Sequence, residues 1–373
     1  MKKHTKAQTA TCSAKALRNC PSGSTVGLDI GDRWTHAAVI GQDGEMVVED
    51  RIASREPEVR RWLSRLPAGV VALEVGTHSR WMAKVGRECG HTVLVANPRQ
   101  LRLIYGGDNK HDRLDAEKLA RLARVDWRLL KPVEHRGEEE QADLARIAVR
   151  EALVEMRTQA VNLVRGMVKS AGGRVAECAT EAFPERAKDR IPAGLVSSLA
   201  PMMEQIRELN DRIRECDDMI EHIARTRYPE VKLLMQVDGV GWLTALTFRL
   251  TVTNPERFER SRDVGCYLGL RPKRNQSGDQ DPQLGITKAG NERLRWMLVN
   301  CAHYILGPFG PDCDLRRWGL KLAGQSRARG AKQRAVVAVA RKLAVLLHRL
   351  WTCGEVYDRL YQAKATGTAA KAA

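Results

Sequence analysis

Residues 25–53 read "TVGLDIGDRWTHAAVIGQDGEMVVEDRIA", and this stretch decides the fold of the first part of the chain. Val26, Leu28 and Ile30 alternate with small or polar residues, which is the period-two pattern of a half-buried strand. Two further apolar runs, "WTHAAVI" and "EMVVEDRIA", lie on either side of the turn signal "QDG" at residues 42–44. The stretch therefore predicts a three-stranded meander.

Helical and strand patterns alternate after the meander. The segments "EPEVRRWLSRL" and "SRWMAKVGREC" have helical spacing, whereas "GVVALEVG" and "HTVLVANP" read as buried strands. This order predicts an α/β domain with a mixed sheet. We place it at residues 23–130, after a basic tail at residues 1–22 that we expect to be disordered.

The region 131–228 is predicted to be almost wholly helical. Its second half has an apolar residue at every third or fourth position: Leu199, Met202, Ile206, Leu209, Ile213, Cys216, Ile220 and Ile223. This spacing is typical of the a/d seam of a coiled coil. Two interpretations stay open, a helical hairpin that packs on itself and a coiled coil that joins protomers.

The charge of the chain favours a polyanionic partner. The formal net charge is +17 and the isoelectric point is about 9.7, and neutralising phosphates releases counterions that drive binding. Residues 315–354 contain ten Lys or Arg and no Asp or Glu, which favours a phosphate-facing surface. This run belongs to a predicted domain at residues 229–360, which a disordered tail at residues 361–373 is expected to follow.

Secretion and membrane insertion are not expected. The basic N-terminus has no apolar segment of the kind found in signal peptides, and no run of about 18 apolar residues predicts a membrane span. The nine cysteines contain no Cys-x-x-Cys pair. This scatter fits a cytoplasmic protein with reduced thiols.

Four carboxylates stand out by their positions. Asp29 lies inside an apolar strand pattern and Glu74 ends another, while Asp112 and Asp115 share one face of a predicted helix. Each one alone has an ordinary structural interpretation as an exposed acid or a partner of a nearby base. Together they supply four hard oxygen donors, which suit Mg²⁺.

The motifs that hold these acids resemble a known signature. "GLDIG", "ALEVG" and "KHDRLDA" resemble the DEDD motifs of RuvC-like, RNase H-like domains, and the last is similar to that of the DEDD insertion-sequence transposases of the IS110 family. The resemblance implies that Asp29, Glu74, Asp112 and Asp115 are the Mg²⁺ ligands. It further implies that Lys110 and Arg113 contact phosphate or balance charge.

The second half of the chain resembles the same family. The stretch "YLGLRPKRNQSGDQDPQLGITKAGNERLR", residues 267–295, is similar to the family's mainly helical C-terminal transposase domain, whose Ser-Gly serine is the nucleophile. The resemblance therefore implies that Ser277 attacks DNA. On sequence grounds alone Ser277 reads as a turn residue.

Cations and glycines near this serine are the candidate nucleic-acid contacts. The cations are Lys273, Arg274, Lys288, Arg293 and Arg295. Upstream, "VDGVGW" carries Gly239 and Gly241 in the pattern of a helix-hairpin-helix turn, in which backbone N–H groups hold a phosphate. A purely structural turn is the alternative interpretation of these glycines.

The resemblance implies a DNA transposase, a recombinase that cuts and rejoins DNA through a phosphoserine intermediate. It also implies a noncoding bridge RNA as guide, and a homo-oligomeric synapse, dimer or tetramer, that shares a composite site. Two alternatives stay open. One is a RuvC-like, Mg²⁺-dependent junction nuclease that uses water as nucleophile, and the other is a non-catalytic protein that binds nucleic acid.

Overall fold

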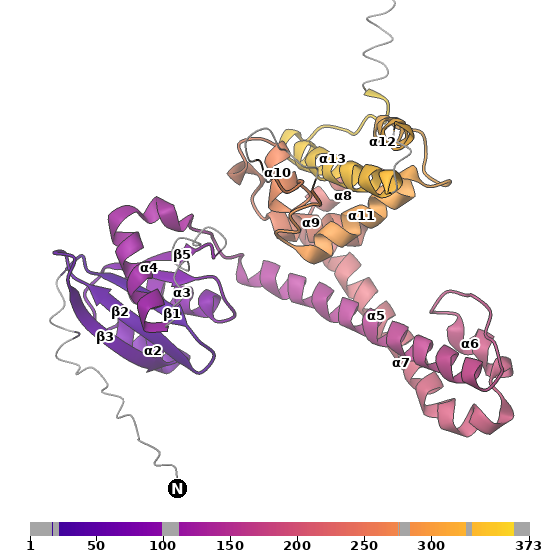
Figure 1. The fold of residues 1–373 in the computed structure, drawn as a ribbon, viewed down its shortest axis with the longest axis horizontal. Helices are drawn as coiled ribbons and strands as arrows, with labels where there is room; N and C mark the ends of the chain where they lie inside the picture. Colours follow the sequence, from indigo (N-terminus) through magenta and orange to yellow (C-terminus); the bar gives the residue numbers. More distant parts are fainter. Residues whose placement is uncertain are drawn as a thin grey trace, which may run out of the picture. The chain divides into compact units, whose positions relative to one another are not determined.

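The computed structural model describes Leu17 and residues 22–98, 112–274, 276, 284–325 and 330–361. Figure 1 labels its helices and strands. The chain divides into two compact units, residues 1–135 and residues 136–373. Most of the two tails expected at the ends of the chain lies outside the described residues. Leu17, however, is fully buried in the core of the first unit, so that part of the basic tail is not detached.

The first unit is built on a five-stranded mixed sheet with the order β3-β2-β1-β4-β5. The strands are β1 (Thr25–Ile30), β2 (Trp34–Ile40), β3 (Met46–Ala53), β4 (Val70–Glu74) and β5 (Thr92–Ala96). β1, β2 and β3 are antiparallel neighbours, while β4 runs parallel to both β1 and β5. The predicted meander and the predicted mixed sheet are both confirmed. The arrangement is consistent with the RNase H-like fold that the resemblance implied.

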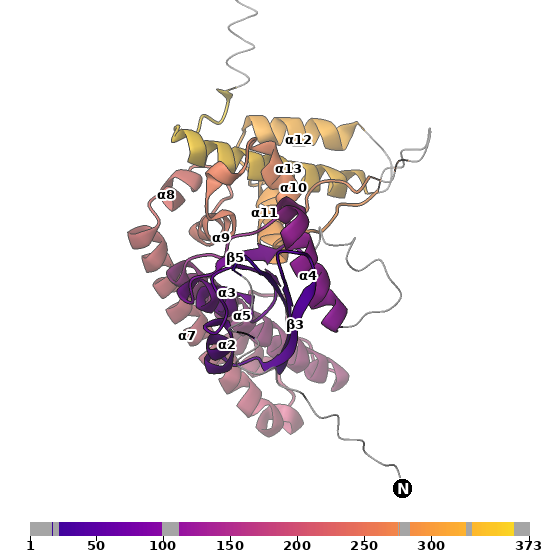
Figure 2. The same ribbon diagram turned by 90° about the vertical axis from the view of Figure 1, so that its left-hand side faces the viewer.

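Helices cover both faces of this sheet, as Figure 2 shows. Val26, Leu28 and Leu73 point into a core shared with α2 (Glu56–Leu63) and α3 (Ser79–Glu88). The opposite face packs against a helix and a 3-10 turn, α4 (Asp112–Asp126) and η2 (Trp127–Leu130). Because side chains alternate along a strand, one face of β1 serves the core and the other serves α4.

Gly27 fixes how closely α4 lies on the sheet. A Cβ atom at Gly27 would lie 1.9 Å from the backbone oxygen of Ala116 and 2.7 Å from the backbone nitrogen of Ala120. No other residue fits under a helix at that separation, because real Cβ contacts are well over an ångström longer than the first of these distances. The glycine in "VGLDI" is therefore required by packing.

The second unit begins with a helical hairpin. Its helices are α5 (Glu138–Ser170) and α7 (Val196–Arg227), and the segment between them carries α6 (Phe183–Ala187), η3 (Lys188–Arg190) and η4 (Ala193–Leu195). The two long helices run antiparallel, since Arg150 pairs with Asp217 and Arg157 donates to Asn210. Asp143, at the start of α5, is buried and accepts a hydrogen bond from Tyr228 after the end of α7.

The apolar seam predicted on α7 is used within this hairpin. Its buried members are Leu199, Ile206, Leu209, Ile213, Ile220 and Ile223. Met203 is buried in place of Met202, whose side chain is only partly covered. Since α7 packs along α5 of the same chain, the structure favours the self-packing hairpin over a seam that joins protomers.

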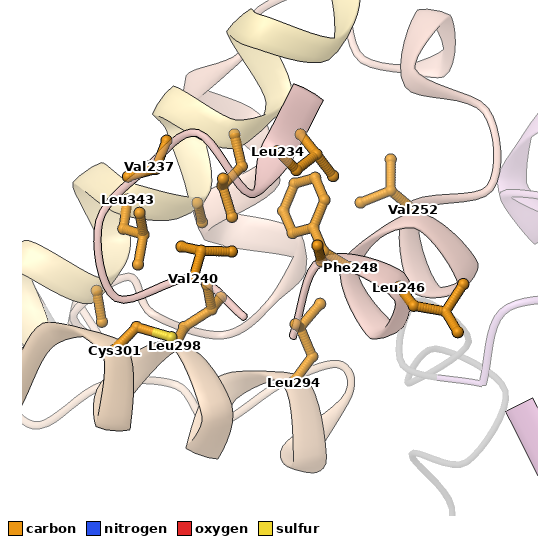
Figure 3. Close-up of a cluster of buried hydrophobic side chains, with 14 of the residues drawn as sticks. Leu234, Val237, Val240, Leu246, Phe248, Val252, Leu294, Leu298, Cys301 and Leu343 are labelled. Carbon is orange, nitrogen blue, oxygen red and sulfur yellow. The ribbon is translucent and has the colours of Figure 1, made fainter. Parts of the chain in front are cut away.

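The remaining helices form a compact bundle in the same unit. They are α8 (Glu230–Leu234), α9 (Trp242–Val252), η5 (Pro255–Arg257), α10 (Arg262–Tyr267), α11 (Glu292–Leu306), α12 (Asp314–Gly324) and α13 (Ala331–Cys353). Figure 3 shows part of the buried core of this bundle, to which Phe248, Leu298 and Leu343 contribute. Within the described residues, no helix is both long enough and apolar enough to cross a membrane.

Replacing Gly27 tests the contact between α4 and the sheet. Gly27→Ala forces its new methyl group against the helix backbone, and overpacking of this kind lowers the free energy of unfolding by about 1–3 kcal/mol. Urea unfolding followed by circular dichroism measures the change. Gly76→Ala is the matched control, because a Cβ atom there meets open space. Equal stability of both variants would contradict the contact.

Candidate functional site

Asp29 and Glu74 lie next to each other at one end of the sheet. The parallel register pairs Leu28 with Leu73, so the next residues along the two strands are Asp29 and Glu74. Ala72, two residues before Glu74, belongs to the cluster that packs against α4. Both carboxylates therefore stand on the face of the sheet that α4 covers, as Gly27 does.

The direction of α4 places its first turn at the same end. Arg121, further along α4, donates to the backbone oxygen of Gly44 at 2.9 Å. Gly44 lies in the turn after β2, near the start of β1, because Thr25 pairs with Ile40. The helix thus runs opposite to β1 and carries Asp115 toward the Asp29 end. Asp115 is buried, with 5% of its surface exposed.

The carboxylates share a face but do not come together as a set of metal ligands in the described residues. Among the described residues, no three His, Cys, Asp or Glu side chains come close enough to hold a metal ion. The Nζ atom of Lys118 lies 3.8 Å from a carboxylate oxygen of Asp115. Asp115 therefore also forms an ordinary salt bridge with a nearby base. The side chains of Asp112 and Arg113, and the whole of Lys110, lie outside the described residues. Carboxylate oxygens are the type of donor that Mg²⁺ prefers, so Asp29, Glu74 and Asp115 are suitable ligands by chemistry, although the described structure does not gather them into a ligand set.

A histidine at the same edge was missed by the sequence analysis. His78 follows β4, and its Nε2 atom lies 3.8 Å from a carboxylate oxygen of Asp32, which follows β1. The indole of Trp81 donates to the other ring nitrogen of His78 at 3.0 Å. Both residues come directly after strands whose carboxyl ends meet, and that placement was the signal that could have found them.

In the second unit, two short segments that flank Ser277 in the sequence pair with each other. Thr287 donates to the backbone oxygen of Arg271, and Lys273 donates to that of Gly285, each at 2.9 Å. An isolated antiparallel bridge joins Pro272 and Ile286 between these bonds. We call residues 271–287 the serine hairpin. Ser277 itself lies outside the described residues.

Close backbone contacts lock the base of the serine hairpin. A Cβ atom at Gly269 would lie 2.2 Å from the backbone nitrogen of Ala289, and Gly269 has a φ of +70° that favours glycine. Arg295 is buried on α11, and its guanidinium donates to the backbone oxygens of Leu268 at 3.2 Å and Ala289 at 2.9 Å. One side chain therefore fastens the segment before the hairpin to the segment after it.

Two of the residues expected to contact phosphate have partners within the protein. Arg295 is buried and stabilises the hairpin base, because its Nη1 atom donates to two carbonyl oxygens. Arg293 forms an ion pair with Glu151 on α5, and partial burial lowers the pKa of this guanidinium. By contrast Lys273, Arg274 and Lys288 are exposed.

The two glycines of the predicted phosphate-binding turn differ. A Cβ atom at Gly239 would lie 2.7 Å from the Cδ1 atom of Tyr304, so packing on α11 accounts for this glycine. Gly241 is the N-cap of α9 and has open space beside it. Gly241 therefore stays a candidate phosphate contact, whereas Gly239 already has a packing role.

A cationic groove of about 1420 Å³ lies beside the serine hairpin. Its walls come from both arms of the hairpin, the start of α10, and helices α12 and α13. Seven cationic side chains line it: Arg262, Arg271, Lys273, Arg274, Arg334, Arg341 and Lys342. The described residues that line this groove include no Asp or Glu.

In the acid-free run at residues 315–354, some cations stabilise the fold and others line the groove. Arg316 donates to the backbone oxygens of Ile305 and Gly307. Hydrogen bonds from Arg317 hold the pKa of Asp312 below its usual range. Arg334, Arg341 and Lys342, in contrast, reach the groove. The expected phosphate-facing surface is therefore confined to part of this run.

Comparisons with known proteins match segments in both units of the chain. A family model for DEDD transposases of the IS110 type matches residues 26–172, and a model described as "Transposase IS116/IS110/IS902 family" matches residues 231–311. A "Probable family 20 transposase" of Pseudomonas aeruginosa is 31% identical over 337 residues, covering 88% of this chain and 96% of that protein. The chain belongs to the IS110 family of transposases.

Two further relatives are also transposases of insertion sequences. The transposase for insertion sequence element IS1111A of Coxiella burnetii is 27% identical, covering 92% of this chain and 93% of its own. The transposase for IS1328 of Yersinia enterocolitica is 26% identical, covering 77% and 85%. As an IS110-family transposase, the protein is an enzyme of DNA cleavage and transfer. The α12–α13 wall of the cationic groove lies beyond both matched segments.

Removing the Arg295 guanidinium tests its structural role. Arg295→Met leaves the carbonyls of Leu268 and Ala289 without their donor, and we expect the free energy of unfolding to fall by about 1.5–3 kcal/mol. Denaturant unfolding measures it. Arg349→Met is the control, since that exposed arginine only pairs with exposed Glu355. If Arg295→Met proves as stable as this control, the guanidinium does not fasten the hairpin base.

Proposed function

We propose that this IS110-family transposase cuts DNA by direct attack of Ser277 and stores the cut as a phosphoserine link. The observation that carries the proposal is the serine hairpin, which is fastened at its base and whose arms line a cationic groove with no Asp or Glu among its described lining residues. A polyanionic strand in that groove lies against the arms that flank Ser277 in the sequence. Cations there also stabilise the extra negative charge that develops on a phosphate under attack.

In the proposed reaction, each bond to phosphorus that breaks is replaced by a new one. The Oγ atom of Ser277 forms a bond to phosphorus while one P–O bond of the DNA backbone breaks. The hydroxyl proton leaves to a base, and the departing sugar oxygen takes up a proton. Rejoining reverses these steps with a different sugar hydroxyl, so no nucleotide triphosphate is consumed.

The carboxylate face of the first unit is the proposed Mg²⁺ site. Asp29, Glu74 and Asp115 share that face, and Asp112 lies one turn before Asp115 on α4. Bound Mg²⁺ supplies positive charge to the reacting phosphate and lowers the pKa of the attacking hydroxyl. Asp29 and Ser277 belong to different units. The reaction therefore needs both units on one DNA, within one chain or across protomers.

The outer face of α5 is the proposed surface that joins protomers in a dimer or tetramer. Residues 142, 145, 149, 152, 156, 159, 163 and 166 are all exposed and follow the three-four spacing of a heptad seam, "AAVAMQLG". Its larger members are Val149, Met156 and Leu163, with 57%, 54% and 49% of their surfaces exposed. Since α7 occupies the inner face of α5, this outer stripe replaces the α7 seam as the intermolecular candidate.

A noncoding bridge RNA is the proposed guide. The net charge of +17 exceeds what one groove of seven cations uses, and surplus cations suit a second, structured polyanion. Sequencing the RNA that copurifies with the protein tests this part of the proposal. Recovery of no discrete RNA species contradicts it.

A charge in the α5 stripe tests the oligomer. Met156→Glu places a carboxylate in the seam, and we expect the molar mass from light scattering to fall to that of a smaller assembly at equal concentration. Met219→Glu, at an equally exposed apolar position on α7, is the control and should leave the mass unchanged. If both variants keep the wild-type mass, the stripe is not the interface.

Replacing the serine tests the chemistry. With a plasmid that carries the encoding element and its flanks, Ser277→Ala should lose the covalent protein–DNA adduct on denaturing gels. Strand cleavage should fall by a factor on the order of 10³ or more. Gln276→Ala, next to it, should retain both. Cleavage that persists without an adduct would show that water is the nucleophile, as in a junction nuclease.

The same assay separates an enzyme from a packaging protein. The double variant Asp29→Asn with Asp115→Asn should abolish adduct and cleavage while DNA binding persists. Unchanged products from that variant would exclude the carboxylate face from the reaction.

A further inference from the structure

The groove beside the serine hairpin is lined by cationic side chains, which we call the rim, and by apolar side chains, which we call the floor. The rim consists of the seven Lys and Arg side chains named above. The floor is formed by side chains from the hairpin arms, α12 and α13, among them Leu284, Ile286, Trp318, Leu322 and Val337. Both surfaces belong to one compact unit. A ligand that uses the whole groove must therefore offer both negative charge and apolar area.

The cations of the rim suit a phosphate ligand. The Nζ atom of Lys342 lies 4.0 Å from the ring centroid of Trp318, and partial burial lowers the pKa of Lys342. A partly desolvated ammonium is stabilised by an anion placed beside it. Lys273 and Arg271, on the incoming arm of the hairpin, are exposed and line the same groove.

A duplex offers no base faces to the apolar floor. A double helix presents phosphates and sugars on its outside, and its base faces are stacked inside. An unpaired strand presents base faces that cover apolar side chains, which is how grooves of this composition bind single strands. Leu284 is 39% exposed at the groove, and Trp318 is only partly covered by the bundle core.

We infer that this groove binds an unpaired DNA strand, with phosphates on the cationic rim and bases against Trp318 and Leu284. The inference rests on the proposed function for the choice of DNA, because the hairpin arms that form one wall flank Ser277 in the sequence. A strand held unpaired in the groove keeps its base edges available for a new partner strand. The α12–α13 wall thereby acquires a role that lies outside both family-matched segments.

Equilibrium binding without Mg²⁺ tests the inference. The probes are one mixed sequence of about 12 nucleotides, a length within the usual range for single-strand sites, as single-stranded DNA, duplex DNA and single-stranded RNA. Fluorescence anisotropy gives each Kd. Trp318→Ala and Leu284→Gln should each raise the Kd for single-stranded DNA about 10-fold and that for duplex less than about 2-fold. Lys273→Gln should weaken both DNA forms by a similar factor.

Matched controls lie on the same helix as Trp318. Leu320→Ala and Lys321→Gln remove an exposed apolar group and an exposed charge outside the groove, and should leave every Kd unchanged. Leu284→Gln guards against misfolding of the Trp318 variant, because Leu284 is exposed and outside the bundle core.

Three results overturn the inference. They are equal weakening of duplex and single strand by the floor variants, no weakening of single-stranded DNA, and weakening confined to RNA, which would assign the groove to a guide. The assay has no cleavage step, so these failures leave the serine chemistry standing. Conversely, if Ser277→Ala still cuts DNA, the proposed chemistry fails while the binding result is unaffected.

Discussion

Both candidate sites depend on a glycine that lets two backbone segments come into close contact. At Gly27 the carbonyl of Ala116 occupies the space that a Cβ atom would need, and this contact sets the height of α4 above the sheet. Asp115 is brought to the Asp29 end of β1 by that one approach. At Gly269 the backbone of Ala289 does the same for the base of the serine hairpin. Because these contacts are between main-chain atoms, they hold their geometry more tightly than side-chain packing does.

The charge of the chain is distributed by function rather than evenly. Buried or paired arginines such as Arg295 and Arg316 donate to carbonyls and stabilise turns. Others, such as Arg341 and Lys342, line the groove, where no described acid neutralises them. A basic run in a sequence therefore mixes two kinds of residue. Only the three-dimensional partners of each cation tell them apart.

The hairpin formed by α5 and α7 shows why one pattern can have two meanings. An a/d seam requires a partner helix, but the seam does not specify whether that partner belongs to the same chain. Here α5 supplies it, and α5 in turn leaves a second stripe exposed on its outer face. A self-contained hairpin and an intermolecular surface are then compatible, because they use opposite sides of the same helix.

The sequence by itself determined the elements and the family. Strand alternation predicted the meander and helical spacing predicted α2, α3 and the long helices, since these patterns reflect only which side of an element is buried. Spaced motifs around Asp29, Glu74 and Asp115 placed the chain in its family, which the comparisons confirmed. Ser277 became a candidate nucleophile by resemblance alone, because a serine in a polar sequence segment carries no chemical signature of its own.

Tertiary structure alone decided which residues share a surface. The groove draws on four separate segments, so Arg262 and Trp318 gave no local signal of their part in it. His78 and Asp32 meet only because β1 and β4 run side by side. Arg295 was expected to meet phosphate, and its inward direction follows from two carbonyls that the chain brings under α11. Side-chain partners depend on contacts between distant segments, and no local pattern encodes those contacts.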